Sequence, residues 1–415
     1  MSDSASSDQE IVAGEATSTP IGTEVQAAAT PMYSIYEIAS DDITFGSPRQ
    51  SWKQPRHFLD DPTVLAIGGL KGQADAAPAL TFFNCRTREW SSTDLWNHIP
   101  ISLSYFGLAH LPERRKLFVI GGDAMMETVD NTFNKASREV ISIDTNNLRQ
   151  KQCSSISKGL IGLTCCAASA NQLLACGGFH YAPKFYQSTV TYTNKFLAFS
   201  YVYNVETGLW KEVKRMIDRR AYAAGANVND RIYMTAGFEG ACTLNEVEYY
   251  DFPTNRWISA PRLPSKRMQH GALSTHGVLF VCGGMDMNFY ENTPIYTSSS
   301  VFLDPRERGW KKGKRMLKAR SGFGLTEIND DPFVIGGFDD SGSMVDCELF
   351  DWRANKWIEM PSLPVISSGL RAVRVDATTA EGLADDVSTA LSATLFSRSS
   401  SSDDSMEVNW DVSEY

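Results

Sequence analysis

One feature constrains the fold of this chain more than any other: a glycine pair, or a near match to one, returns six times, each time after a short apolar run. Successive copies are separated by 53, 56, 59, 47 and 53 residues. A period of this size indicates one repeated supersecondary unit, because each unit buries its apolar face only when a neighbour stacks on it. The six copies are Gly68–Gly69, Gly121–Gly122, Gly177–Gly178, Ala236–Gly237, Gly283–Gly284 and Gly336–Gly337.

Each repeat also carries a second landmark, an Asp or Asn six residues before a Trp, which is present in five of the six units. The second unit keeps Asp144 but has Gln150 where the Trp is expected. The residues between the landmarks are β-branched and aromatic, which is typical of short strands buried on at least one face. The five pairs are Asn84 and Trp90, Asn204 and Trp210, Asp251 and Trp257, Asp304 and Trp310, and Asp351 and Trp357.

These landmarks predict four antiparallel strands per unit, with the glycine pair at the end of the second strand and the Trp on the fourth. Gly is required where the backbone takes a positive φ or approaches a neighbour closely. The Trp supplies a large buried area between adjacent sheets. Six such units predict an all-β fold, a six-bladed β-propeller. We interpret the repeated Gly, Asp or Asn, and Trp as structural.

The most explicit unit, NEVEYYDFPTNRWISAPRLPSKRMQHGALSTHGVLFVCGG (245–284), resembles a Kelch repeat, and the similarity covers roughly residues 53–375. It looks like the repeats of the Kelch-like family, the substrate adaptors of cullin-type ubiquitin ligases. The resemblance implies a protein-interaction module that recruits a ubiquitin-ligase client or binds a cytoskeletal element such as actin. About fifty residues precede the repeats. We therefore expect the BTB and BACK regions of those adaptors to be missing.

Charge and composition predict three regions. Residues 1–50 and 376–415 are acidic and poor in apolar residues, so we expect both to be mostly disordered. Residues 51–375, the predicted propeller, contain 32 acidic and 37 basic residues, although the whole chain has a net charge of −10. A basic propeller favours an acidic peptide segment as its partner; the alternative is that the tails only keep the protein soluble.

The first repeat lacks a good innermost strand, because the stretch before it contains Pro55, and proline is rare in central strands. After the last Trp, ISSGLRAVRV (366–375) aligns with ARSGFGLTEI (319–328) of the sixth unit. We therefore predict that residues 369–375 return to complete the first blade and close the ring.

Three arginines form the first part of a predicted partner-binding face. Arg220, Arg267 and Arg320 each lie 16 residues before the first position of a glycine pair, where the chain passes from one blade to the next. By similarity, the Kelch-like adaptors use arginines at this position to grip acidic peptides, and a guanidinium pairs well with carboxylates. The alternative is that these arginines belong to the repeat and contact only neighbouring blades.

Enlarged loops between second and third strands form the other part, because strand alternation places them on the same face as the blade connections. They span 123–138, 179–195 and 285–300. Aromatic residues are enriched at binding hot spots. We predict partner contacts by Phe179, His180, Tyr181 and Tyr290; the alternative is that they pack the loops down.

Sequence motifs for catalysis or for a cofactor are missing. The six histidines show no metal-ligand spacing, and no G-x-S-x-G, H-E-x-x-H or P-loop pattern occurs. We therefore expect no catalytic residue, metal site or cofactor. We interpret the basic run 306–320 as a solvated strand edge and expect no nucleic-acid partner. One alternative is a sugar-acting propeller enzyme, a mutarotase or epimerase with carboxylates in its central channel; another is a scaffold whose tails do the binding.

Targeting features point to the cytoplasm, with the nucleus as an open alternative. No charged apolar leader opens the chain, and no run of 18 apolar residues occurs, so we expect neither secretion nor a membrane partner. None of the eight cysteines forms a C-x-x-C motif, and most lie on predicted strands. This usage is typical of free thiols in a reducing compartment.

Overall fold

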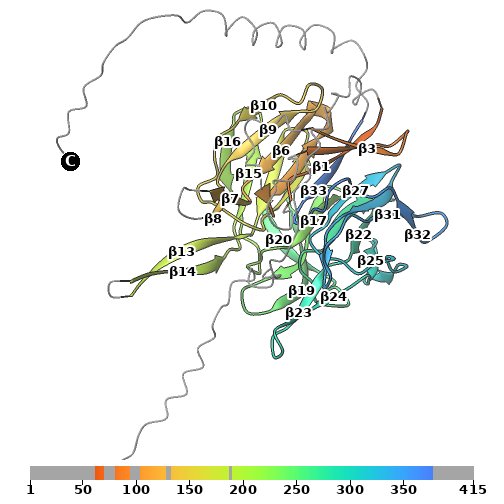
Figure 1. Ribbon diagram of the computed structural model, residues 1–415. Coiled ribbons are helices and arrows are strands. Elements are labelled where there is room, and N and C mark those ends of the chain that lie inside the picture. The colour runs from red at the N-terminus through yellow and green to blue at the C-terminus, as the bar shows by residue number, and fades with distance from the viewer. Residues whose placement is uncertain (1–60, 70–79, 94–102, 128–131, 187–188, 377–415) are drawn as a thin grey trace, which may run out of the picture. The chain divides into compact units, whose positions relative to one another are not determined.

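The structure, a computed structural model, describes residues 61–69, 80–93, 103–127, 132–186 and 189–376, all in one compact unit. The predicted tails lie outside these residues, except for Asp376. The six-bladed, all-β propeller is confirmed, since the unit contains six four-stranded antiparallel sheets (Figure 1). A single 3-10 turn, Pro112–Arg114, is the helical element among the described residues. None of their helical segments has the length and apolar character needed to cross a membrane.

The strands of each blade are given from the innermost outward. Blade 1 contains β33 (Arg371–Val375), β1 (Thr63–Ile67), β2 (Leu80–Asn84) and β3 (Glu89–Thr93). Blade 2 contains β5 (Gly107–Leu111), β6 (Lys116–Ile120), β9 (Val140–Asp144) and β10 (Gln150–Gln152). Blade 3 contains β11 (Thr164–Ser169), β12 (Gln172–Cys176), β15 (Ser200–Asn204) and β16 (Leu209–Glu212).

The other three blades follow the same order. Blade 4 contains β17 (Ala224–Val228), β18 (Arg231–Phe238), β19 (Thr243–Asp251) and β20 (Arg256–Ala260). Blade 5 contains β21 (Gly271–Thr275), β22 (Val278–Cys282), β25 (Ser300–Leu303) and β26 (Lys311–Lys312). Blade 6 contains β27 (Gly324–Ile328), β28 (Asp331–Ile335), β31 (Cys347–Asp351) and β32 (Lys356–Met360).

The enlarged loops are folded into ribbons of their own. The longest pairs β13 (Phe179–Tyr186) with β14 (Thr189–Phe196) and projects from blade 3 (Figure 1). The others are β23 (Met285–Asn288) with β24 (Thr293–Tyr296), β29 (Phe338–Asp339) with β30 (Gly342–Ser343), and β4 (Leu103–Ser104) with β7 (Asp123–Glu127) and β8 (Thr132–Ala136).

Blade 1 joins the two ends of the described chain. Strand β33 pairs antiparallel with β1, in a register that runs from Thr63 opposite Val375 to Ile67 opposite Arg371. The innermost strand of the first blade therefore comes from the C-terminal side, and the ring is closed by hydrogen bonds between segments about 300 residues apart.

In blades 4 and 6 the repeated Trp ties the blade to the connection that precedes it. The indole Nε1 of Trp257 donates to the carbonyl of Lys214 at 2.8 Å, and that of Trp357 donates to the carbonyl of Lys314 at 2.9 Å. The Trp357 ring also packs beside Phe280 of blade 5 and Phe350 of blade 6. One side chain thus fills the space between blades and satisfies a backbone carbonyl of the connection.

A closed circle of six backbone hydrogen bonds joins the starts of the innermost strands. In each unit one residue of the blade connection, just before the innermost strand, adopts a positive φ, and its N–H donates to the carbonyl of the corresponding residue in the preceding blade. The distances are between 2.6 and 3.0 Å. Because the innermost strands surround the central channel, this circle rims the channel at their N-terminal ends. Its members are Tyr105, Gly162, Tyr222, Gln269, Gly322 and Gly369.

Candidate interaction face

The three predicted arginines lie inside their blades, so the expectation of an exposed arginine arc is wrong. The exposed fractions of Arg220, Arg267 and Arg320 are 0%, 1% and 0%. Nη1 of each donates to the carbonyl of the first glycine-pair position of its own unit, sixteen residues later, at 2.9 to 3.0 Å. In blade 4 the ladder register shifts between Thr235 and Gly237, so the buried carbonyl of Ala236 lies at an irregularity of the sheet, where Arg220 supplies its donor. The spacing of sixteen thus has a structural cause.

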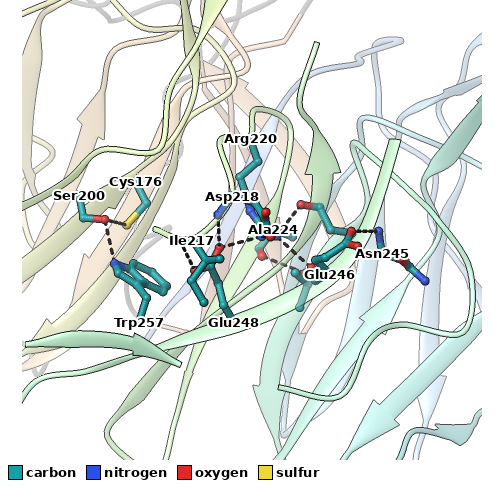
Figure 2. A network of polar contacts seen from close by, with 12 residues as sticks. Cys176, Ser200, Ile217, Asp218, Arg220, Ala224, Asn245, Glu246, Glu248 and Trp257 are labelled. Carbon is teal, nitrogen blue, oxygen red and sulfur yellow. Dashed lines mark hydrogen bonds and ion pairs between the residues drawn. The ribbon is translucent and has the colours of Figure 1, made fainter. Parts of the chain in front are cut away.

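A buried carboxylate completes the arrangement in blades 4 and 6. Nη2 of Arg220 donates to Glu248 at 2.7 Å, and the backbone N–H of Ile217 donates to the same carboxylate at 2.8 Å (Figure 2). Arg320 and Glu348 repeat the pair at 2.5 Å. Burial raises the pKa of Glu248 above its usual value, although the Arg220 charge opposes that shift. These groups hold the blade connection onto the third strand.

Blade 5 keeps the arginine but lacks the carboxylate. Val301, which pairs with Val281, occupies the position that Glu248 has in blade 4 and Glu348 has in blade 6. Nη2 of Arg267 donates instead to the hydroxyls of Ser265 and Ser299 at 2.8 and 3.0 Å. Burial lowers the pKa of Arg267 to about 10, because no carboxylate offsets the cost of removing its charge from water.

The predicted aromatic contacts fall into two groups. Phe179 is 2% exposed and packs against the rings of Phe196 and Tyr222, so the prediction that it contacts a partner is wrong. His180 and Tyr181 are partly exposed on the same ribbon, whereas Tyr290 is fully exposed. Contact by these three residues stays a prediction.

The tip of the β23–β24 ribbon presents apolar side chains to solvent. Phe289 is 48% exposed, and Ile295 is 55% exposed. Phe289 is also stacked on Phe238 of the neighbouring blade, with ring centroids 6.1 Å apart. This stacking anchors the ribbon, so that Tyr290 and Ile295 are held in position beside it.

The blade connections carry exposed basic side chains on the same face as the ribbons. Isolated bridges between Ala221 and Phe238, Met268 and Met285, and Ser321 and Phe338 join each connection to the adjacent loop. The sequence analysis did not predict these basic residues as part of the face, because it interpreted 306–320 as a solvated strand edge. The signal was their recurrence, since basic residues precede each of the three buried arginines. The exposed bases of the three consecutive connections are Lys214, Arg215, Arg219, Arg262, Lys266, Lys314, Arg315 and Lys318.

The central channel contains a cavity of about 150 Å³, lined by residues of all six innermost strands. Its polar side chains include His110, His270 and Arg371, and none of its lining residues is Asp or Glu. The carboxylate that the sugar-acting enzyme would require is therefore not in the lining. In the described part of the chain, no group of three or more His, Cys, Asp or Glu side chains is placed to hold a metal ion.

Residues 116–337 match the family described as the KLHDC2/KLHL20/DRC7 Kelch-repeats domain, and residues 319–364 match the Kelch motif. The first match spans more than half of the chain. The chain belongs to the Kelch-repeat proteins.

Among the relatives of this Kelch-repeat protein, Kelch-like protein 40 of Xenopus laevis is 26% identical over 215 residues, which cover 51% of this chain and 33% of that protein. Kelch-like protein 33 of Homo sapiens is 31% identical over 113 residues, 27% of this chain and 21% of that protein. The chain thus spans a third or less of these relatives. A solved structure titled "Structure of YjhT" has a TM-score of 0.54 at 16% identity and covers 73% of this chain and all of that one, which shows a shared fold.

Proposed function

We propose that this Kelch-repeat propeller is a protein-interaction module that binds an acidic protein segment across the connections that lead into blades 4, 5 and 6. The observation that carries the proposal is the row of exposed bases on these connections, beside the exposed apolar tip of the β23–β24 ribbon. Few of these bases are compensated: Arg215, Arg262 and Lys318 have carboxylate partners within 3.3 Å, whereas no such partner lies beside Arg219 or Lys266 among the described residues.

The two kinds of group have different tasks in binding. Exposed bases attract an acidic segment and speed its association, but each contributes little affinity in water. Tyr290 and Ile295 offer the apolar area that a hot spot requires. His180 and Tyr181 extend the contact to the β13–β14 ribbon. By resemblance to the Kelch-like adaptors, the bound segment belongs to a client of a ubiquitin ligase or to actin.

The experiment compares two charge-reversal variants of equal size. The first, Arg219→Glu, Lys266→Glu and Lys318→Glu, alters the proposed face. The second, Arg256→Glu, Arg353→Glu and Lys356→Glu, alters exposed bases of the turns at the opposite face.

Both variants and the wild type are used for affinity purification from cell extract and quantitative proteomics, and purified actin is tested separately by cosedimentation. We expect only the first variant to lose its specific partners, because only that variant reverses charges on the proposed face. Equal capture by the two variants would contradict the proposed face. If the first variant loses only actin binding, the bound segment belongs to actin. If it loses ubiquitin-ligase components instead, the bound segment belongs to a client of that ligase.

A further inference from the structure

The cavity in the central channel contains a cationic group that no carboxylate balances. Arg371 lines it, with Nε donating to the carbonyl of Phe106 at 3.1 Å and Nη1 to that of Leu370 at 3.4 Å. Both acceptors are neutral, and no ion pair of Arg371 occurs among the described residues. Burial lowers the pKa of this guanidinium. Arg371 is partly exposed, and a charge that is partly removed from water without an ionic partner would be stabilised by an anion beside it.

Arg371 also breaks the pattern of the innermost strands. The equivalent position in the other five units is occupied by Gly, Thr or Ala. At Gly107 and Gly271 a Cβ would lie 2.3 Å from Cys165 and 2.6 Å from Leu325 of the next blade, so small residues let the blades approach each other there, whereas Arg371 places a long cationic side chain in the cavity lining. The five small residues are Gly107, Thr164, Ala224, Gly271 and Gly324.

His270 supplies a second polar group to the cavity. It is 7% exposed, and its Nδ1 has no hydrogen-bond partner, whereas Nε2 lies 2.7 Å from the hydroxyl of Thr235. That hydroxyl donates its only hydrogen to the carbonyl of Ala224 at 2.9 Å, so it accepts from Nε2.

The protonation of His270 follows from its surroundings. Burial, together with the charges of Arg267, Arg220 and Arg371, holds the pKa of His270 well below its usual range, and the ring is neutral near pH 7. With the hydrogen on Nε2, Nδ1 is a buried acceptor that lacks a donor.

We propose that this cavity binds a small oxyanion that carries its own hydroxyl group, such as hydrogen phosphate or a short hydroxycarboxylate. The negative oxygens accept from Arg371, and the hydroxyl donates to Nδ1 of His270. The volume of about 150 Å³ suits the size of such a ligand, since a cavity of that volume accommodates about six non-hydrogen atoms. Besides Arg371 and His270, the lining contains His110, Thr164 and otherwise apolar or small residues, and it includes no acidic side chain that would repel an anion.

Binding is measured by isothermal titration calorimetry on the full chain, with inorganic phosphate, glycolate, sulfate and acetate as separate probes at constant ionic strength. We expect saturable binding of phosphate or glycolate at one site per chain. The matched anions without a hydroxyl, sulfate and acetate, should bind at least about tenfold more weakly, because their oxygens would face the lone pair of Nδ1. Whichever of phosphate and glycolate binds with the higher affinity shows whether the natural ligand is a phosphate or a hydroxycarboxylate.

Two variants of the same strand locate the site. Arg371→Met should weaken binding at least about tenfold, whereas Arg374→Met, which alters an arginine outside the cavity lining, should leave it unchanged. Absence of saturable binding by the wild type, or equal weakening by both variants, would overturn the proposal. Equal affinity for sulfate and phosphate would overturn the role of His270. None of these results depends on whether a protein binds at the outer face.

Discussion

The buried ion pair of blade 4 allows a quantitative test of why the repeated arginine is internal. Glu248 is 2% exposed and Arg220 is 0% exposed, and Nη2 and Oε1 are 2.7 Å apart. Glu248→Gln keeps the size of the side chain and one acceptor oxygen, but it leaves the guanidinium with only the partly exposed carboxylate of Asp218, 3.2 Å from Nη2, as a counter-charge. Breaking a buried pair in this way costs about 3 to 5 kcal/mol. Because the amide oxygen still accepts from Ile217, we expect the lower end, about 3 kcal/mol.

This free energy converts into a melting temperature through the unfolding entropy. At about 2.1 cal/mol/K per residue, a propeller of roughly 315 residues has an unfolding entropy of about 0.65 kcal/mol/K. Glu248→Gln should therefore lower the melting temperature by about 5 °C in differential scanning calorimetry. Arg220→Met should lower it further, because the carbonyls of Ala236 and Glu246 then lose their donor as well.

Glu246→Gln is the matched control, two residues away on the same strand. Glu246 pairs with Arg262 at 3.3 Å, and the Arg262 side chain is 70% exposed, so water screens the pair. Exposed pairs contribute less than about 1 kcal/mol, so this variant should melt within about 2 °C of the wild type. If Glu248→Gln and Glu246→Gln melt at the same temperature, the buried pair does not hold the connection as we infer.

Three further predictions concern the ring and the channel. Ending the chain at residue 365 removes β33 and should abolish the cooperative melt of the propeller; an unchanged melt would refute the closure. Gly162→Ala should destabilise more than Gly277→Ala, because both glycines have positive φ but a Cβ at Gly162 would lie 3.0 Å from the Tyr222 ring; equal urea midpoints would contradict this packing. Burial lowers the pKa of His110 to about 4, so between pH 6.5 and 4 the unfolded chain binds a proton that the folded chain does not. The free energy of unfolding should therefore fall by up to about 3 kcal/mol as the pH drops from 6.5 to 4. In urea titrations, the free energy of unfolding of His110→Gln should fall less than that of the wild type over the same pH range.

The fold could be predicted from the sequence because its determinants are periodic. The glycine pair takes a positive φ at Gly283 and Gly284, where a Cβ would lie 2.6 Å from Phe323 and 2.7 Å from His270 respectively. The Asp or Asn before each Trp accepts from the turn that follows it, as Asn204 does from Glu206 and Thr207. Such residues recur at fixed positions of the repeat, so their spacing alone shows where the strands and turns of each blade lie.

The site could be predicted only in part, since spacing does not tell which way a side chain turns. Arg220 at the start of an inner strand fits both an exposed rim and a side chain folded back onto its own blade. The sequence did contain the deciding signal: Glu248 and Glu348 interrupt apolar third strands twelve residues after the first glycine-pair position. A charged residue on a buried strand requires a buried partner, and the arginine of the same unit is the one available.

The same reasoning separates the structural from the functional residues of this repeat. A buried side chain that recurs at one register position in several blades, such as Arg220, has similar neighbours in each blade, so packing within the blade explains its recurrence. Binding to one segment or one small ligand does not repeat six times. Candidate binding groups are therefore found where one blade departs from the others, as Arg371 does among small residues and as the β23–β24 ribbon does with exposed Tyr290. For this propeller, the departures from the period are the more informative residues for function.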